Sequence, residues 1–135
     1  MSTQTSPFAP LLAENYASLT TFRKNGVGVA TPMWFAVEND IIYINTGSTS
    51  GKVKRIRHTS RITLAPCSGS GKVTGAVIEA TARISSDPQE IARAEAALAG
   101  KYRWQRRVLY FFRDIASIFQ RQQGARSYLI IEPQS

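Results

Sequence analysis

Cysteine and histidine are scarce in this sequence, and their scarcity narrows the classes of protein to which it can belong. Cys67 is the single cysteine, which excludes an internal disulfide framework and a cysteine-ligated zinc site. His58 is the single histidine, so histidine-rich metal centres and a conventional serine–histidine–aspartate triad are disfavoured. No pair of carboxylates suggests hydrolysis. We therefore expect no metal site, and the sequence identifies no catalytic side chain, so any chemistry would come from a bound cofactor.

Long apolar runs are also missing from the sequence. No stretch approaches the roughly 18 apolar residues of a membrane-spanning helix. The first eight residues lack the basic segment and the apolar run of a secretion signal, so we expect a cytoplasmic location. The 135 residues fit one domain, which we expect to cover residues 1–135, because domains usually contain about 100 to 200 residues.

Acidic residues are outnumbered by basic ones. The chain has 17 Lys and Arg residues against nine Asp and Glu residues, which gives a formal net charge of +8. An excess of this sign favours anionic partners. Nucleic acid, an acidic membrane surface and a phosphorylated cofactor all satisfy that requirement, and charge alone does not separate them.

Short strands with tight turns dominate the chain, which predicts a small barrel or sandwich. Asn25-Gly26 is a strong hairpin signal, because both residues tolerate a positive φ angle. Pro32 lies in the middle of a predicted strand, where it indicates an edge, a bulge or a place where a ligand meets the backbone. The predicted strands are residues 19–22, 27–37, 41–45, 61–67, 72–84 and 127–131.

Four helical segments are predicted. Leu11, Leu12 and Tyr16 are spaced as the apolar side of one or two helical turns near the N-terminus, and a short helix is expected over residues 52–58. A third helix begins at Asp87 and is expected to stop at Gly100. A fourth is expected from about Arg103 to Gly124, and its basic residues are more typical of a solvated face than of a nucleic-acid or lipid surface. They are Lys101, Arg103, Arg106, Arg107 and Arg113.

The densest chemistry of the sequence lies between Ser50 and Arg57. A Ser-Gly pair before a helix exposes backbone N–H groups at the positive end of the helix dipole, where an anion is favoured. Lys52 and Arg55 are three residues apart and share one side of this helix, next to its apolar edge. The alternative is a solvated basic face. Because the loop, the helix start and the two cations coincide, we favour a phosphate-binding site.

Four segments occur in an order that resembles the pyridoxamine 5'-phosphate oxidase-like superfamily of split β-barrels, in particular its branch of F420-dependent oxidoreductases. They are Leu19–Gly26, Thr31–Phe35, Gly51–Arg57 and Arg61–Cys67. The resemblance implies a mainly β (α+β) fold, a six-stranded split β-barrel with flanking helices. It also implies a homodimer, with a flavin or deazaflavin in a groove between the subunits.

The same resemblance implies roles for ten residues. Lys52 and Arg55 would hold the cofactor phosphate, with help from Ser50, Gly51 and Arg57. Thr46 would lie near the ribityl chain. The residues that would run along the ring system are Thr31, Pro32, Met33 and Trp34.

The resemblance further implies an F420-dependent reductase that transfers a hydride from the reduced deazaflavin to a small unsaturated or conjugated substrate. An FMN-binding reductase or flavin-binding protein of the same fold is one alternative. Gly51 stands where FMN oxidases of the superfamily commonly have an arginine, which favours F420. A basic module that binds nucleic acid or a membrane surface is a further alternative, although we expect no nucleic-acid partner.

Overall fold

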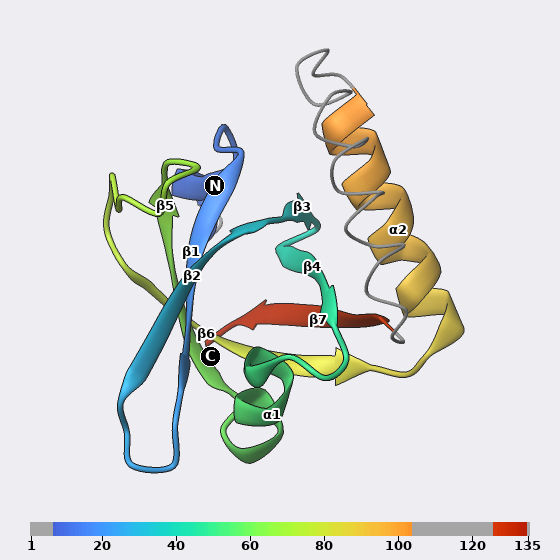
Figure 1. The fold of residues 1–135 in the computed structure, drawn as a ribbon. Helices are drawn as coiled ribbons and strands as arrows, with labels where there is room; N and C mark the ends of the chain where they lie inside the picture. The colour runs from blue at the N-terminus through green and yellow to red at the C-terminus, as the bar shows by residue number, and fades with distance from the viewer. Residues whose placement is uncertain (1–6, 104–125, 135) are drawn as a thin grey trace, which may run out of the picture.

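The computed structural model describes residues 7–103 and 126–134, which form a curled, fully antiparallel sheet with helices outside it (Figure 1). The seven strands follow the order β2-β1-β5-β6-β7-β4-β3 across the sheet. The strands are β1 (Tyr16–Phe22), β2 (Gly28–Trp34), β3 (Ala36–Glu38), β4 (Ile41–Gly47), β5 (Arg61–Cys67), β6 (Ile78–Ser85) and β7 (Arg126–Pro133). The helices are η1 (Ala9–Leu11), α1 (Gly51–His58) and α2 (Pro88–Arg103).

The sheet curls because its two edge strands are neighbours in sequence. β2 ends at Trp34 and β3 begins at Ala36, so only Phe35 separates the two edges of the described sheet. The chain therefore pulls the edges together. The buried side chains of the inner face fill the enclosed space, and among the largest are Leu19, Ile44, Ile62, Leu64, Leu129 and Phe35. The predicted mainly β class with flanking helices is confirmed.

Tight turns join the strands where the sequence predicts them. Gly26 has a φ of +89°, and the side chain of Asn25 accepts a hydrogen bond from the Val27 N–H at 3.0 Å. Asn39 and Asp40 both adopt positive φ angles, 52° and 61°, in the turn between β3 and β4. Both are residue types that tolerate this conformation, which explains why the turn falls there.

Two predicted strands are not continuous, and one of them changes the strand count from six to seven, while β1 begins three residues before its predicted start at residue 19. The expected strand over residues 27–37 is broken at Phe35, whose fully buried ring turns into the core as the chain passes from β2 to β3. The expected strand over residues 72–84 is regular only in β6. Residues 72–77 instead form a loop that returns towards β5, where the Thr74 N–H donates to the Pro66 carbonyl at 2.8 Å.

Two helix predictions also need correction. Gly100 does not stop the third helix, because α2 continues through it to Arg103, and Gly100 is not in the left-handed conformation that ends helices. Near the N-terminus Leu11 is buried, but Leu12 is exposed and Tyr16 begins β1. The predicted helix from about Arg103 to Gly124 lies outside the described residues, as do its basic positions Arg106, Arg107 and Arg113.

The start of α2 is capped as predicted. The Asp87 carboxylate accepts a hydrogen bond from the Gln89 N–H at 2.9 Å. Glu90, in the first turn, accepts a hydrogen bond from Ser85 and forms a salt bridge with Arg83 of β6. The hydrogen bond from the Arg83 guanidinium, then that from Ser85, lower the pKa of Glu90 to about 2. This carboxylate therefore fastens α2 to the sheet.

Glu90→Gln should lower the free energy of unfolding at pH 7 by about 1 to 2 kcal/mol, because Arg83 loses one of its two carboxylate partners and keeps only Glu132. Since the folded pKa of Glu90 lies below its ordinary value of 4.5, the stabilisation is complete above pH 4.5 and is lost as the pH falls towards 2. Urea unfolding at several pH values measures this difference. Glu79→Gln is the control, because the Glu79–Arg61 pair is half exposed. A pH-independent loss in Glu90→Gln would contradict the assignment.

Helices α1 and α2 pack against different parts of the sheet. α1 lies against β1 and β6, with Val53 and Ile56 buried beneath it, as the sequence predicts. α2 packs on β3 and β4, and its buried Ala94 joins a small cluster with Tyr43 and Ile130. Within the part of the chain that the structure describes, no helix combines the length and the apolar character that crossing a bilayer would require.

Candidate anion and cofactor site

The start of α1 is arranged to receive an anion. Ser50 is the N-cap residue in an extended conformation, and its hydroxyl accepts a hydrogen bond from the Val53 N–H at 3.4 Å. The first turn contains no acidic residue. The backbone N–H groups of this turn therefore retain the partial positive charge of a helix N-terminus.

The Arg55 side chain runs back towards the N-terminal end of α1, so its guanidinium lies beside Gly51. A Cβ atom at Gly51 would lie 2.7 Å from Arg55 Nη1, so the guanidinium occupies the space that any larger residue would take. Arg55 Nε donates a hydrogen bond of 2.6 Å to Thr21 Oγ1 on β1, which fixes its position. The small Gly51 therefore leaves room for the Arg55 guanidinium, and the hydrogen bond to Thr21 holds it at the helix start.

Lys52 adds a second cation to this group. The side chain is half-buried, and its burial, followed by the charge of Arg55, lowers the pKa of Lys52. Two like charges thus lie close enough to destabilise each other. An anion placed between them would relieve this repulsion and satisfy the helix N-terminus at the same time.

Hydroxyl groups surround the start of α1. Thr46 Oγ1, at the end of β4, lies 3.4 Å from Ser50 Oγ, and Ser48 Oγ lies 2.8 Å from Ser127 Oγ on β7. The pairing of β4 with β7 sets Thr46 opposite Ser127. The sequence predicted Thr46 and Ser50 as cofactor-binding residues, but it did not point to Ser48 and Ser127. No local pattern marks Ser127, which reaches the site only through the pairing of strands about 80 residues apart.

The four residues of β2 that the sequence assigned to a ring system alternate between two faces. Thr31 and Met33 are half-buried and point to the inner side, where Met33 packs against the core. Pro32 is exposed on the outer side, and the ring of Trp34 lies 6.2 Å from that of Tyr16. Because β2 is an edge strand of the described sheet, the edge is the one of the three alternatives for Pro32 that the fold shows.

Arg57 stands apart from the other predicted phosphate ligands. It lies exposed in the last turn of α1, about 140° around the helix from Lys52. Lys54 and His58 are also exposed, as the helical spacing predicts. Of the predicted phosphate ligands, the fold therefore brings together Ser50, Gly51, Lys52 and Arg55, whereas Arg57 lies on the solvent side.

The residues present fit a phosphorylated cofactor. The cations and the helix start suit its phosphate, and the buried Thr31 Oγ1 has no hydrogen-bond partner among residues 7–103 and 126–134. An unpaired buried hydroxyl costs the folded protein about 1 to 3 kcal/mol. Cys67 offers no alternative chemistry, because it is buried and its burial raises the pKa of the thiol.

Thr31→Val should raise the free energy of unfolding of the unliganded protein by about 1 kcal/mol, because it replaces an unpaired buried hydroxyl by a methyl group of similar shape. Urea unfolding without ligand provides the measurement. Thr63→Val, at a half-buried position of β5, is the comparison. A loss of stability in Thr31→Val would show that Thr31 Oγ1 is paired in the free protein.

The fold defines a split-barrel protein, and Lys52 and Arg55 place positive charge at the start of α1. The family model for pyridoxamine 5'-phosphate oxidase matches residues 8–133. The chain belongs to this family. The superfamily that the sequence resembles is thereby confirmed. No curated protein matches the chain.

Solved structures share the fold. A conserved hypothetical protein from Mycobacterium tuberculosis is 18% identical, with a TM-score of 0.69 over 100% of this chain and 82% of that chain. An FAD-binding protein from Mesorhizobium loti is 11% identical, with a TM-score of 0.62 over 93% and 84% of the two chains. An F420 reductase is 13% identical, with a TM-score of 0.57 over 95% and 93%. At these identities the structures show a common fold.

Proposed function

We propose that this protein is an F420-dependent oxidoreductase that reduces a small unsaturated or conjugated compound. The observation that carries the proposal is the convergence of Lys52, Arg55 and the capped start of α1 on one point. The F420 reductase among the structural neighbours supports it, because that protein spans nearly the same length of chain with the same fold. The net charge of +8 also suits F420, whose polyglutamate tail adds carboxylates beyond its phosphate.

The residues of the site have distinct tasks in this proposal. Lys52, Arg55 and the backbone at Gly51 bind the phosphate, while Ser50 caps the helix that presents them. Thr46 holds the Ser50 hydroxyl and lies towards the ribityl chain. When bound, the deazaflavin would supply hydride chemistry.

The four residues of β2 complete the proposed site. The ring system would run along the backbone of β2, beside Thr31 and Met33, whose side chains turn to the inner face. Pro32 and Trp34 lie on the outer face of β2, at the edge of the described sheet. Because Pro32 has no N–H group, the edge backbone at this position donates no hydrogen bond to a further strand. Arg57, on the solvent side of α1, is not part of the proposed phosphate site.

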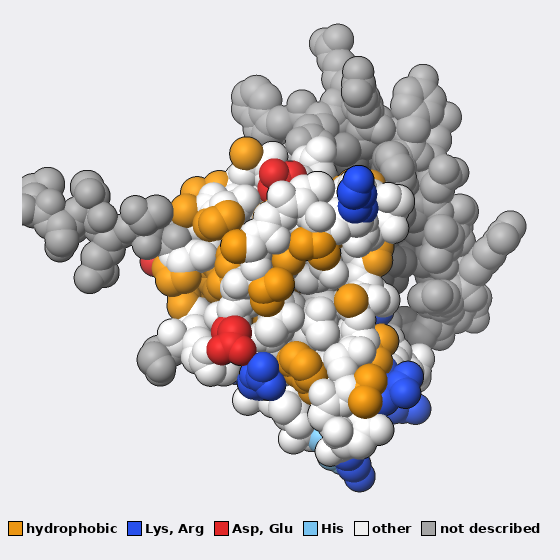
Figure 2. All heavy atoms as spheres, turned by 90° about the vertical axis from the view of Figure 1, so that its left-hand side faces the viewer, with side chains coloured by type: hydrophobic (Ala, Val, Ile, Leu, Met, Phe, Trp, Pro, Cys, Tyr) orange, Lys and Arg blue, Asp and Glu red, His pale blue; other side chains and the backbone are white. Residues whose placement is uncertain are grey.

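A homodimer is part of the proposal, with the cofactor in the groove between subunits. The face that carries β1, β2, β5 and the loop over residues 68–77 presents many hydrophobic side chains, as Figure 2 shows. Val73 and Val77 on this loop are 49% and 64% exposed. A second copy that covers this face would remove the apolar surface from water. We propose a cytoplasmic location for the dimer.

FMN is the second candidate cofactor, and the match to the pyridoxamine 5'-phosphate oxidase family favours it. The same cations would hold its phosphate. A yellow purified protein with a flavin spectrum would indicate FMN, whereas a colourless protein that binds added F420 would indicate the deazaflavin.

Parallel fluorescence titrations of the full chain with F420 and with FMN test the proposal. We expect saturable binding of F420, tighter than that of FMN. A control titration with duplex DNA at two salt concentrations tests the basic binding module. Steeply salt-dependent binding of DNA, together with binding of neither cofactor, would overturn the proposed function.

A further inference from the structure

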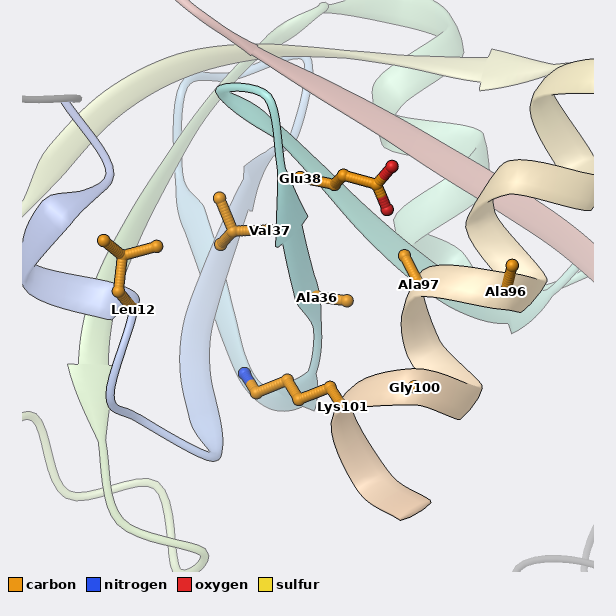
Figure 3. Close-up of a pocket in the computed structure, with 8 residues that line it drawn as sticks. All are labelled: Leu12, Ala36, Val37, Glu38, Ala96, Ala97, Gly100 and Lys101. Carbon is orange, nitrogen blue, oxygen red and sulfur yellow. The ribbon is translucent and has the colours of Figure 1, made fainter. Parts of the chain in front are cut away.

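A pocket lies away from α1, between strand β3 and the last turns of α2 (Figure 3). It is an open pocket with a volume of about 360 Å³, which is within the range of small-molecule sites, about 300 to 1,000 Å³. It shares no lining residue with the site at the start of α1. Its lining residues are Leu12, Ala36, Val37, Glu38, Ala96, Ala97, Gly100 and Lys101.

Small apolar side chains and polar atoms both line this pocket, and its two charged groups, Glu38 and Lys101, lie at separate places. Ala36 and Glu38 point from β3 towards α2, and Ala97 faces them from the helix (Figure 3). The Lys101 side chain crosses from α2 towards the start of β3, where its Nζ lies 3.4 Å from the centre of the Phe35 ring. A bound molecule would therefore meet an ammonium group, small aliphatic side chains and a carboxylate, while the Phe35 ring stays buried beneath Lys101.

We propose that this pocket binds a small aromatic monocarboxylate. The carboxylate of the ligand would pair with Lys101, and its ring would lie against the alanine walls. The far end of the ligand would be uncharged, because Glu38 repels a second anion there. This inference does not rest on the proposed cofactor, because it uses none of the residues at the start of α1.

The protonation of Lys101 agrees with this assignment. Burial lowers the pKa of Lys101 to about 8, although the charge of Glu14, in the segment before β1, acts in the opposite direction. Glu14 and Glu38 are the acidic groups that face this part of the described structure. An anion at Lys101 favours the ammonium form. Binding should therefore be strongest below pH 8 and weaken as the pH rises above it.

Calorimetric titration of the full chain with 3-phenylpropionate tests the proposal. We expect saturable binding at pH 7, at least tenfold weaker in Lys101→Met and at least partly restored in Lys101→Arg. Gly100→Leu should abolish binding, since a side chain at this position enters open space on the pocket wall and leaves the fold intact. Lys72→Met, an exposed lysine outside the pocket, is the matched control and should bind like the unaltered protein.

A comparison of the affinities of two ligands provides a second test of the proposal. Phenylsuccinate, which carries a further carboxylate, should bind more weakly than 3-phenylpropionate, and Glu38→Gln should reduce this difference. Failure of 3-phenylpropionate to saturate the protein at millimolar concentration would overturn the proposal. Binding that Lys101→Met and Gly100→Leu leave unchanged would overturn it as well. Neither result would affect the cofactor site, whose titrations use different ligands and residues.

Discussion

Replacing Lys52 and Arg55 together with alanine should weaken cofactor binding by about 100-fold or more. Each cation contributes a charge-assisted hydrogen bond to the phosphate, worth roughly 1.5 to 3 kcal/mol, so the pair contributes at least about 3 kcal/mol. Thr21 loses its hydrogen bond from Arg55 in this variant, but the buried Val53 and Ile56 still hold α1 to the sheet. The variant should therefore remain folded. Fluorescence titration with F420 measures the loss, and circular dichroism checks the fold.

Lys54→Ala combined with Arg57→Ala is the matched control for this experiment. It removes the same charge from the same helix, but both residues are exposed and lie away from the start of α1. We expect a loss of less than about tenfold, from weaker long-range attraction. Equal losses in the two double variants would mean that net charge alone attracts the cofactor, which contradicts a specific phosphate site.

Phe35→Ala should lower the free energy of unfolding by about 3 to 5 kcal/mol, the usual cost of truncating a buried phenylalanine. Phe35 is fully buried, and it is the one residue between the two edge strands β2 and β3 of the described sheet. Its loss leaves a cavity where the curled sheet closes and removes the ring under Lys101 Nζ. Urea unfolding followed by tryptophan fluorescence measures the effect.

Phe22→Ala provides the comparison. Phe22 is half-buried at the far end of β1, and the guanidinium carbon of Arg61 lies 4.6 Å from the centre of its ring. We expect a loss of about 1 kcal/mol from this substitution. Similar losses at Phe22 and Phe35 would contradict the role of Phe35 as the residue that closes the sheet.

Local chemistry made much of the fold predictable from the sequence. The strand over Arg61–Cys67 has the predicted bounds, and α1 begins one residue before its predicted start at Lys52. Asn25-Gly26 and Asn39-Asp40 form turns because these residue types tolerate positive φ angles. In each case neighbouring residues determine the structure, so a short window of sequence contains the necessary information.

The errors arose where distant parts of the chain decide the local structure. Valines and aromatic residues continue from Val27 to Val37 without a turn signal, and only the closing of the sheet breaks the strand at Phe35. Gly100 resembles a helix stop, yet α2 continues through it to Arg103, which shows that an isolated glycine does not by itself end a helix.

The candidate site was also predictable only in part, where local spacing determines it. Helical spacing alone placed Lys52 and Arg55 on one side of α1, next to its buried edge. The sequence did not reveal that Thr21 fixes Arg55, because the two residues are 34 positions apart. It also did not separate Thr31 and Met33 from Pro32 and Trp34, which the pleat of β2 sends to opposite faces.

The most direct measurement of the phosphate site compares the deazaflavin with and without its phosphate arm, in the unaltered protein and in the variant with alanine at positions 52 and 55. The unaltered protein should bind the phosphorylated form at least about 100-fold more tightly, and the variant should bind the two forms almost equally. A preference for the phosphorylated form that survives in the variant would contradict the account, because the phosphate would then bind elsewhere.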